Sequence, residues 1–372
     1  MNFLIVTEPD DVHAIYVDLA LKSIGHQVIN FFSADFPTVQ KNSVYIDSRE
    51  YRCRTANKLG IIEHSGYDVV WWRRPRNPYL DKDKIYIEDY KFYKRENMIF
   101  HDSFTHQLAP GAWWINRKEA AIRSNYKLLQ LKIASDVGMK IPTTLCSNDF
   151  HEIKDFYLDH REGIIYKPLT FQFWDEGDAI KICYTAKINS LEMLDYCKSC
   201  MIPGIYQEQI KKKFELRVTC FGDYIVAAKI NSQEFKDGEL DWRKIKSDEL
   251  KLEPFELPQG LQQQIRYLMR ELGIVFGCLD FIVTPDNEFV FLEVNEQGQF
   301  LFIEQLCPDI PMLDMFVSFL LKQTINFHWI RGNSNLSMRH FEQYIPSVLT
   351  ENKTRHVDVR AIAQIKNKKL VS

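Results

Sequence analysis

The sequence predicts a mixed α/β (α+β) protein built from two or three domains. Its 372 residues correspond to that number at roughly 150 residues per domain. Hydrophobic residues make up 45% of the chain and aromatic residues 13%, which is enough to build real cores and argues against disorder. Apolar runs of strand length alternate with helix-like segments in the first third, and paired strand-like runs dominate the rest.

Charge and composition exclude several classes of protein. The net charge of −3, from 47 basic and 50 acidic residues, argues against a nucleic-acid partner. No apolar run approaches the roughly 20 residues of a membrane-spanning helix, so no membrane partner is expected. The N-terminal segment lacks a basic region before its apolar stretch and predicts a first strand, not a signal peptide. The eight cysteines are scattered, which favours reduced thiols in a cytoplasmic protein.

The first third is expected to form a small α/β domain. Asp10 and Asp11 can cap a helix that runs to Lys22, and Gly25 is placed to end it. No Gly-x-Gly-x-x-Gly follows the first apolar run, so dinucleotide binding is not indicated. Three strands are expected here, over residues 3–6, 28–32 and 67–72.

The clearest helical pattern lies between Asn116 and Gly138. Ser124 can cap this helix, because its hydroxyl can accept from free backbone N–H groups. Gly138 is well placed just after the helix end. Apolar residues recur at helical spacing in between, at Leu128, Leu131, Ala134 and Val137.

The remaining chain predicts strands, hairpins and one further helix. Turns are expected at Gly222-Asp223 and at Pro285–Asn287, and a helix over 259–272. Beyond Asn326 the chain is basic and weakly periodic, and it is expected to be an appendage outside the core. The expected strands cover residues 163–167, 180–184, 205–209, 216–221, 225–230, 278–283 and 289–294.

The last predicted hairpin carries three candidate metal ligands. Asp280 lies on one strand, and Glu293 and Asn295 lie two residues apart on the next, so the latter two share a face. Hard oxygen donors of this kind suit Mg²⁺ whose remaining ligands are water and phosphate oxygens. The alternative is an ordinary polar outer face of a hairpin.

Two lysines are candidates for contacts to phosphate. Lys127 lies near the start of the predicted helix, and Lys167 ends a strand next to an irregular loop. The loop that follows Lys167 is poor in glycine and is not a P-loop. The alternative for each lysine is a solvated surface charge.

A further segment suits recognition of a nucleoside. Glu208 and the backbone near it can read an adenine edge, and Glu215 can accept from ribose hydroxyls. Arg217 alternates with Leu216 and Val218, so its side chain is expected to point away from the core they enter. The lysine run at 211–213 is expected to be a solvated loop.

These candidates occur in an order that resembles ATP-grasp ligases of the RimK-like branch: Lys127, Lys167, Gln207-Glu208, Glu215-Leu216-Arg217, Asp280 and Glu293-x-Asn295. Other segments are similar to the ATP-grasp peptide maturases, which include the microviridin macrocyclases, also called graspetide synthetases. Those segments are 70–74, 207–244 and 284–295, of which Asn231-Ser232-Gln233 and Asp241-Trp242-Arg243 point most directly to peptide maturases.

The resemblance implies an ATP-grasp fold preceded by an α/β domain. It implies a pre-ATP-grasp domain over 1–118, a central domain over 119–204, a C-terminal grasp domain over 205–325 and an extension of unknown role over 326–372. ATP would lie between the central and C-terminal domains. A homodimer is also expected.

The resemblance further assigns roles to residues. Mg²⁺ would be held by Asp280, Glu293 and Asn295, and the acyl phosphate and oxyanion would be stabilised by Arg217 and Arg243. ATP would be bound by Lys127, Lys167, Gln207, Glu208, Ile210, Glu215 and Asn231.

The implied activity is an ADP-forming ligation on a ribosomal precursor peptide, made of a leader and a core. A side-chain carboxylate would be activated as an acyl phosphate, and a Ser or Thr hydroxyl or a Lys amine of the same peptide would close a macrolactone or macrolactam. The alternatives are a ligase that adds amino acids to a protein or small acceptor, and a peptide-binding scaffold without catalysis. The metal triad argues against the scaffold.

Two features lie outside the family pattern or the catalytic set. The family often has Pro-x-Gly after the metal asparagine, whereas this chain has Glu296-Gln297-Gly298. Glu192 and Asp195, which would neighbour each other on a helix, are candidates for leader recognition. The alternatives are an ordinary solvated helix face, or a leader that docks at Arg73, Arg74 or the tail beyond Asn326.

Overall fold

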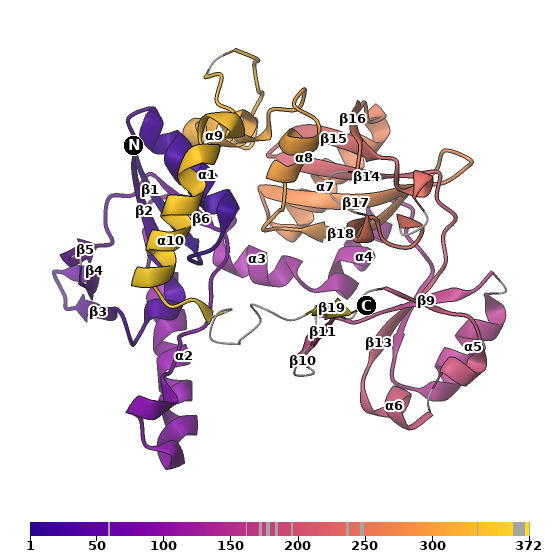
Figure 1. Ribbon diagram of the computed structural model, residues 1–372, viewed down its shortest axis with the longest axis horizontal. Coiled ribbons are helices and arrows are strands. Elements are labelled where there is room, and N and C mark those ends of the chain that lie inside the picture. The colour runs from indigo at the N-terminus through magenta and orange to yellow at the C-terminus, as the bar shows by residue number, and fades with distance from the viewer. Residues whose placement is uncertain are drawn as a thin grey trace.

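A computed structural model describes residues 1–58, 60–160, 162–170, 173–175, 179–182, 185–194, 196–235, 238–245, 249–332, 334–359 and 369–371. Figure 1 shows an N-terminal region, a central region and a third region with the largest sheet. Within the described residues, none of the helices combines the length and apolarity needed to cross a bilayer.

The N-terminal region is a parallel sheet with the strand order β2-β1-β6-β7. As predicted, the Asp11 carboxylate caps a helix, accepting from the His13 N–H at 3.2 Å, and Gly25 follows the helix end with a φ of 85°. The elements are β1 (Asn2–Thr7), α1 (Val12–Ser23), β2 (Gln27–Phe32), the small sheet β3 (Lys41–Ile46), β4 (Tyr51–Asn57) and β5 (Gly60–Glu63), β6 (Val69–Trp72), α2 (Tyr90–His106), which extends downward in Figure 1, and β7 (Trp113–Ile115).

The predicted helix between Asn116 and Gly138 is two helices, α3 (Lys118–Ser124) and α4 (Lys127–Asp136). The expectation that Ser124 caps it is wrong, because the Ser124 hydroxyl donates backwards to the Ala121 carbonyl at 3.0 Å. Tyr126 stands at the N-cap of α4 without a side-chain capping bond. Gly138, with a φ of 81°, ends the second helix as predicted.

The central region is an antiparallel sheet of the order β12-β9-β13-β8. Because β13 pairs with both β8 and β9, the domain boundary expected at 204/205 falls inside this sheet, and the link to the next sheet is 209–213. The elements are β8 (Thr144–Ser147), α5 (Phe150–Asp159), β9 (Ile164–Lys167), β12 (Ala186–Ile188), α6 (Tyr196–Met201) and β13 (Gly204–Glu208).

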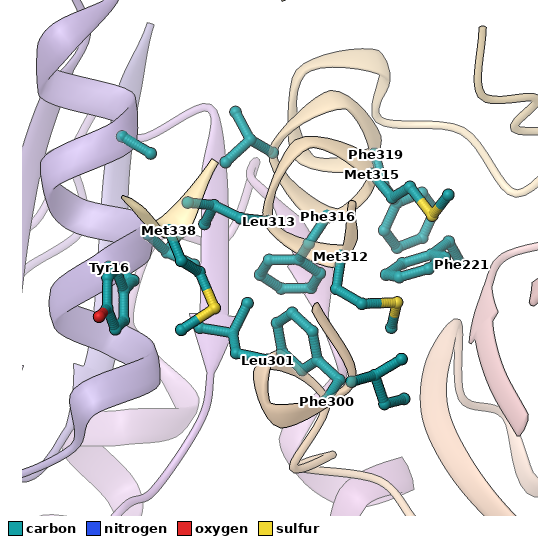
Figure 2. Close-up of a cluster of buried hydrophobic side chains, with 14 of the residues drawn as sticks. Tyr16, Phe221, Phe300, Leu301, Met312, Leu313, Met315, Phe316, Phe319 and Met338 are labelled. Atoms are coloured by element: carbon teal, nitrogen blue, oxygen red, sulfur yellow. The ribbon is translucent and has the colours of Figure 1, made fainter. Parts of the chain in front are cut away.

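The third region is a five-stranded antiparallel sheet, β16-β15-β14-β17-β18, covered on both faces. One face packs on apolar side chains of α4 and α7, and the other on α8 and α9. Figure 2 shows the second face, where Phe221 of the sheet meets Phe316 and Phe319. The elements are β14 (Phe214–Phe221), β15 (Tyr224–Ile230), β16 (Leu252–Phe255), α7 (Gln259–Leu272), β17 (Phe276–Val283), β18 (Phe289–Asn295), α8 (Leu301–Leu306) and α9 (Met312–Lys322).

The expectation that the chain beyond Asn326 lies outside the core is wrong. Several of its side chains are buried in the same apolar cluster as α9, namely Phe327, Leu336, Met338, Phe341 and Ile345. Met338 stands beside α1 and α9 in Figure 2. The spacing of apolar residues did not predict this packing, because the segment enters the core through 3₁₀ turns and loops, which have no regular hydrophobic period, before α10 (Ile345–Arg355).

The last described residues return to the central region. They form β19 (Lys369–Val371), which runs parallel to β11 (Ala179–Ile182), itself paired with β10 (Phe173–Asp175). Figure 1 shows the C-terminus next to this short sheet, between the N-terminal region and the central sheet.

Candidate active site

The two carboxylates of the predicted metal triad lie directly opposite each other. Asp280 on β17 pairs in register with Glu293 on β18, so both point to one face, and Asn295 follows two residues later on that face. The Asp280 side chain is 19% exposed and that of Glu293 32%, and Asn295 is exposed. Hard oxygens that are partly exposed fit Mg²⁺ together with phosphate oxygens.

The described residues hold no cluster of three or more His, Cys, Asp or Glu side chains that could bind a metal by themselves. The donor set therefore rests on two carboxylates and the Asn295 amide, with further ligands left to substrate or solvent. This pattern suits Mg²⁺, which keeps several waters or substrate oxygens.

Each carboxylate has a cation beside it. Arg217 donates through Nη1 to both oxygens of Asp280, at 2.9 and 3.0 Å, and Lys127 Nζ lies 3.4 Å from Glu293 Oε2. Burial raises the pKa of Asp280, against the opposing effect of Arg217. Burial also works against the charge of Glu293, yet Lys127, Lys167 and Arg243 together hold the pKa of Glu293 below its usual range.

Gln130 sets the position of Lys127 against the hairpin. It is 2% exposed, donates to the Val294 carbonyl at 2.9 Å and accepts from the Val294 N–H at 2.9 Å. It also donates to the Ser124 carbonyl at 2.5 Å, across the break between the two helices. A side-chain amide thus pairs with β18 in place of another strand, which holds the start of α4 beside Glu293.

Lys167 ends β9, and its ammonium group is close enough to Lys127, Lys212 and Arg243 for their charges to act on it. Burial lowers the pKa of Lys167 to about 8, with Glu293 acting against this shift and Lys127, Lys212 and Arg243 acting with it. An anion that approached here would meet several positive charges and one partly desolvated ammonium group.

The expected adenine-reading segment lies at the end of β13, an inner strand of the central sheet. Gln207 is 2% exposed and donates to Thr144 Oγ1 at 2.9 Å, while its Oε1 lacks a hydrogen-bond partner among the described residues. Glu208 accepts from the N–H of Thr143 at 2.7 Å and from its hydroxyl at 3.1 Å. Ile210 is partly exposed just beyond β13.

Two other expected nucleotide contacts already have protein partners. Glu215 is 6% exposed and lies 3.1 Å from Lys212 Nζ, and burial raises its pKa. Asn231 donates to Glu253 Oε1 at 3.3 Å. The Lys212 side chain is itself 9% exposed, so the expectation of a solvated lysine run is wrong at this position.

The two expected catalytic arginines differ in their surroundings. Arg217 is 5% exposed, and its two terminal nitrogens are engaged, since Nη2 also donates to the Gln299 carbonyl at 3.0 Å, whereas its buried Nε has no hydrogen-bond partner among the described residues. Arg243 lies in a 3₁₀ turn, pairs with Asp241 at 2.7 Å and keeps 56% of its side chain exposed. Arg243 is therefore the more accessible of the two to a bound substrate.

The residues expected to contact a leader differ in their exposure. Arg73 is fully buried, so the expectation that it contacts a leader is wrong. Arg74 is ion-paired with Glu8 at 2.8 Å and keeps 18% of its side chain exposed, and its role stays a prediction. Glu192 is exposed in a 3₁₀ turn, and Leu194 after it has extended backbone, which contradicts the expected single helix face. Asp195 lies outside the described residues.

Comparison with protein-family models found no match for this sequence, and comparison with curated proteins found none either. Solved structures do match. A RiPP-associated ATP-grasp ligase from Chryseobacterium gregarium, in complex with ADP and a leader and core peptide, is 26% identical with a TM-score of 0.79, over 87% of this chain and 97% of that one.

The macrocyclase MdnC from Microcystis aeruginosa, bound with the precursor peptide MdnA, is 27% identical with a TM-score of 0.74, over 87% of this chain and 100% of that one. The ATP-grasp ligase PsnB, complexed with a precursor variant, Mg and ADP, shares the fold at 18% identity and a TM-score of 0.63, over 86% of this chain and 98% of that one. The ATP-grasp fold and the resemblance to peptide maturases are thereby confirmed.

Proposed function

We propose that this chain, an ATP-grasp ligase similar to the RiPP-associated enzymes, modifies a ribosomal precursor peptide at the expense of ATP. The observation that carries the proposal is the pairing of Asp280 and Glu293 across one hairpin, each next to a cation from another element. Similarity to ligases solved with ADP and precursor peptides supports the assignment of substrates.

ATP would bind between the central sheet and the β17–β18 hairpin. Lys127 and Lys167 supply positive charge for its phosphates, and the unpaired Oε1 of Gln207 is an acceptor for the adenine amino group. Asp280, Glu293 and Asn295 would hold Mg²⁺, which supplies charge neutralisation at the β- and γ-phosphates. The roles of Glu208, Ile210, Glu215 and Asn231 stay predictions.

The chemistry that we propose has two steps. A side-chain carboxylate oxygen of the peptide attacks the γ-phosphorus, the bond to the bridging oxygen breaks, and ADP leaves an acyl phosphate behind. A hydroxyl or amine of the same peptide then adds to the acyl carbon, loses its proton and expels phosphate. Arg243, with 56% of its side chain exposed, is placed to stabilise the charge on the acyl phosphate, whereas Arg217 holds Asp280.

The test is incubation of the purified chain with ATP, Mg²⁺ and the precursor peptide encoded nearest to its gene. Ring closure predicts a loss of one water mass per ring, with one ADP formed for each ring. A ligase that adds amino acids, the second candidate, would instead raise the mass of its acceptor. ADP release without any change in peptide mass would contradict both.

A cytoplasmic location and a homodimer belong to the same proposal. The six cysteines whose side chains the structure describes are all free, which supports a reducing compartment. Light scattering on the purified chain tests the homodimer, and a monomer mass at assay concentration would contradict it.

A further inference from the structure

The loop that follows the candidate metal ligand Asn295 is bonded to that ligand. Asn295 Oδ1 accepts from the Gln297 N–H at 3.1 Å and from the Gly298 N–H at 3.0 Å. These bonds tie the amide oxygen, the only atom of this side chain that can ligate a metal, to the loop, and Mg²⁺ would take the place of one of them. Where the loop lies therefore decides where the Asn295 amide lies.

The carbonyls of this loop are held by a buried arginine from the N-terminal region. Arg73 is 0% exposed and donates through Nη1 to the carbonyls of Gln297 and Gly298, the latter at 2.6 Å. Its Nε donates to Asp11 Oδ2 at 3.0 Å, and Thr7 donates to the same oxygen at 2.9 Å. The planar guanidinium thus joins the first helix of the chain to a loop more than two hundred residues later.

His13 holds the end of the same loop. Its Nε2 lies 3.2 Å from both the Phe300 and the Leu301 N–H, and since a backbone N–H can only donate, Nε2 is the acceptor. Burial lowers the pKa of His13 to about 3, with Arg73 acting in the same direction, so the ring is neutral as this role requires. The helix α8 has no side-chain cap of its own, and His13 takes that place.

The loop has little freedom to move without these contacts being lost. Gly298 has a φ of 56°, and a Cβ there would come within 2.8 Å of the Phe276 ring and 3.0 Å of Cys278 Sγ. The carbonyl between the two sets of contacts, that of Gln299, accepts from Arg217, the partner of Asp280. Two of the three candidate metal ligands are thereby connected to one loop, Asp280 through Arg217 and Asn295 directly.

We propose that Arg73, Asp11 and His13 are positioning residues of the N-terminal region, which hold the loop 297–301 and through it orient Asn295 for metal binding. The inference rests on the proposed Mg²⁺ site. It assigns the N-terminal region a part in the active site that is exerted through the loop. Because Asp11 neutralises Arg73, the buried cation holds the loop without adding net positive charge beside the metal.

The first test uses Arg73→Gln and measures two properties of the purified chain. Amide hydrogen exchange over 297–301 without nucleotide should become faster, because the carbonyl contacts are lost. Calorimetric Mg²⁺ titration of binding to a non-hydrolysable ATP analogue should give an apparent Mg²⁺ affinity lower by about tenfold. Lys118→Gln is the matched control, since it also removes a nearly buried cation of the N-terminal region, 3.1 Å from Asp102, but touches no part of the loop.

A double-mutant cycle separates positioning from general stability. If Arg73 acts through Asn295, then Arg73→Gln should cause a clearly smaller loss of Mg²⁺ affinity in an Asn295→Ala background than in the wild-type chain. Equal losses in both backgrounds, or a loss in the Lys118→Gln control as large as that in Arg73→Gln, would overturn the inference. A wild-type chain without Mg²⁺-dependent nucleotide binding would contradict the proposed function instead.

His13→Ala keeps the inference testable if Arg73→Gln does not fold. It removes the acceptor of two loop N–H groups and leaves the Arg73–Asp11 pair in place. Exchange at Phe300 and Leu301 should become faster, and the apparent Mg²⁺ affinity should fall. Unchanged exchange together with unchanged Mg²⁺ affinity would overturn the inference.

Discussion

At the scale of single residues, the candidate site balances buried charges that come from different elements. Glu293 sits among Lys127, Lys167 and Arg243, while Asp280 is held by Arg217. Removing one charge from such a cluster leaves the others without partners, which costs more than the loss of an exposed ion pair. Effects on ligand binding should therefore be large at the site and small at surface pairs of the same residue types.

Glu293→Gln should abolish Mg²⁺-dependent nucleotide binding, because one carboxylate ligand is lost and the neighbouring lysines repel each other without it. Calorimetric titration with the ATP analogue measures this, and the thermal midpoint checks that the fold persists. Glu288→Gln is the control, a glutamate of the same hairpin that pairs with Lys140 on the surface. Wild-type binding in the first variant would remove Glu293 from the metal site.

Nucleotide affinity should fall as the pH rises through the pKa of Lys167. That pKa is lowered to about 8 by burial, and only the protonated ammonium group attracts phosphate. Between pH 7 and pH 9 the protonated fraction of a group with this pKa drops about tenfold, and affinity should drop with it. Titrations at both pH values test this. Lys167→Arg keeps its charge and should show a flatter profile; equal slopes would exclude Lys167 as the source.

At the scale of elements, the break between α3 and α4 decides where Lys127 stands. Hydrophobic spacing predicted one helix, because apolar side chains recur without interruption from Leu128 onward. The structure ends the first helix at Ser124 and begins the second at Lys127, with Gln130 bonded to both Ser124 and β18. A glutamine that pairs with a strand far along the chain leaves no local trace in the sequence.

Gln130→Ala should lower the free energy of unfolding by about 2–4 kcal/mol, because buried backbone groups of Val294 and Ser124 lose their partner. Urea unfolding measures it, and nucleotide affinity should fall as well, since Lys127 is no longer held beside Glu293. In the control Gln264→Ala, a partly exposed side chain loses one bond to the Gly138 carbonyl. A loss no greater than that of the control would mean that Gln130 does not join α4 to the hairpin.

At the scale of the whole molecule, the C-terminal segment is part of the core. The buried carboxylates Glu304 and Asp314 accept from it, the former from the Met338 N–H at 2.8 Å and the latter from the Leu336 N–H at 3.0 Å. Further along, the Val357 N–H donates to Asp35 at 2.7 Å, which connects this segment to the N-terminal region. The C-terminal segment therefore connects α8 and α9, which cover the five-stranded sheet, with the N-terminal region.

Truncation after Asn326 should prevent cooperative folding. It removes five buried apolar side chains at roughly 1.5–3 kcal/mol each, which is comparable with the whole stability of a domain. Truncation after Asp358 should leave the thermal midpoint within a few degrees, since the buried part of the segment is kept. Scanning calorimetry compares the two. A cooperative transition in the shorter chain would show that the segment is an appendage after all.

The sequence by itself determined much of the fold and the order of the site. Apolar runs identified most strands of the parallel and five-stranded sheets, the helix expected over 259–272 coincides with α7, and turn residues located the hairpin of Asp280 and Glu293. Such features depend on neighbours in the chain, so a single sequence contains them. The resemblance to ATP-grasp ligases rested on the spacing of those same residues.

The tertiary structure alone decided which of these residues act together. Arg73 was expected as a possible contact to a leader, yet it is buried against Asp11 and the loop after Asn295. The same holds for the buried C-terminal segment. Burial and pairing of this kind arise from contacts between residues hundreds of positions apart, and the energy of such contacts depends on packing and dielectric surroundings that exist only once the chain has folded.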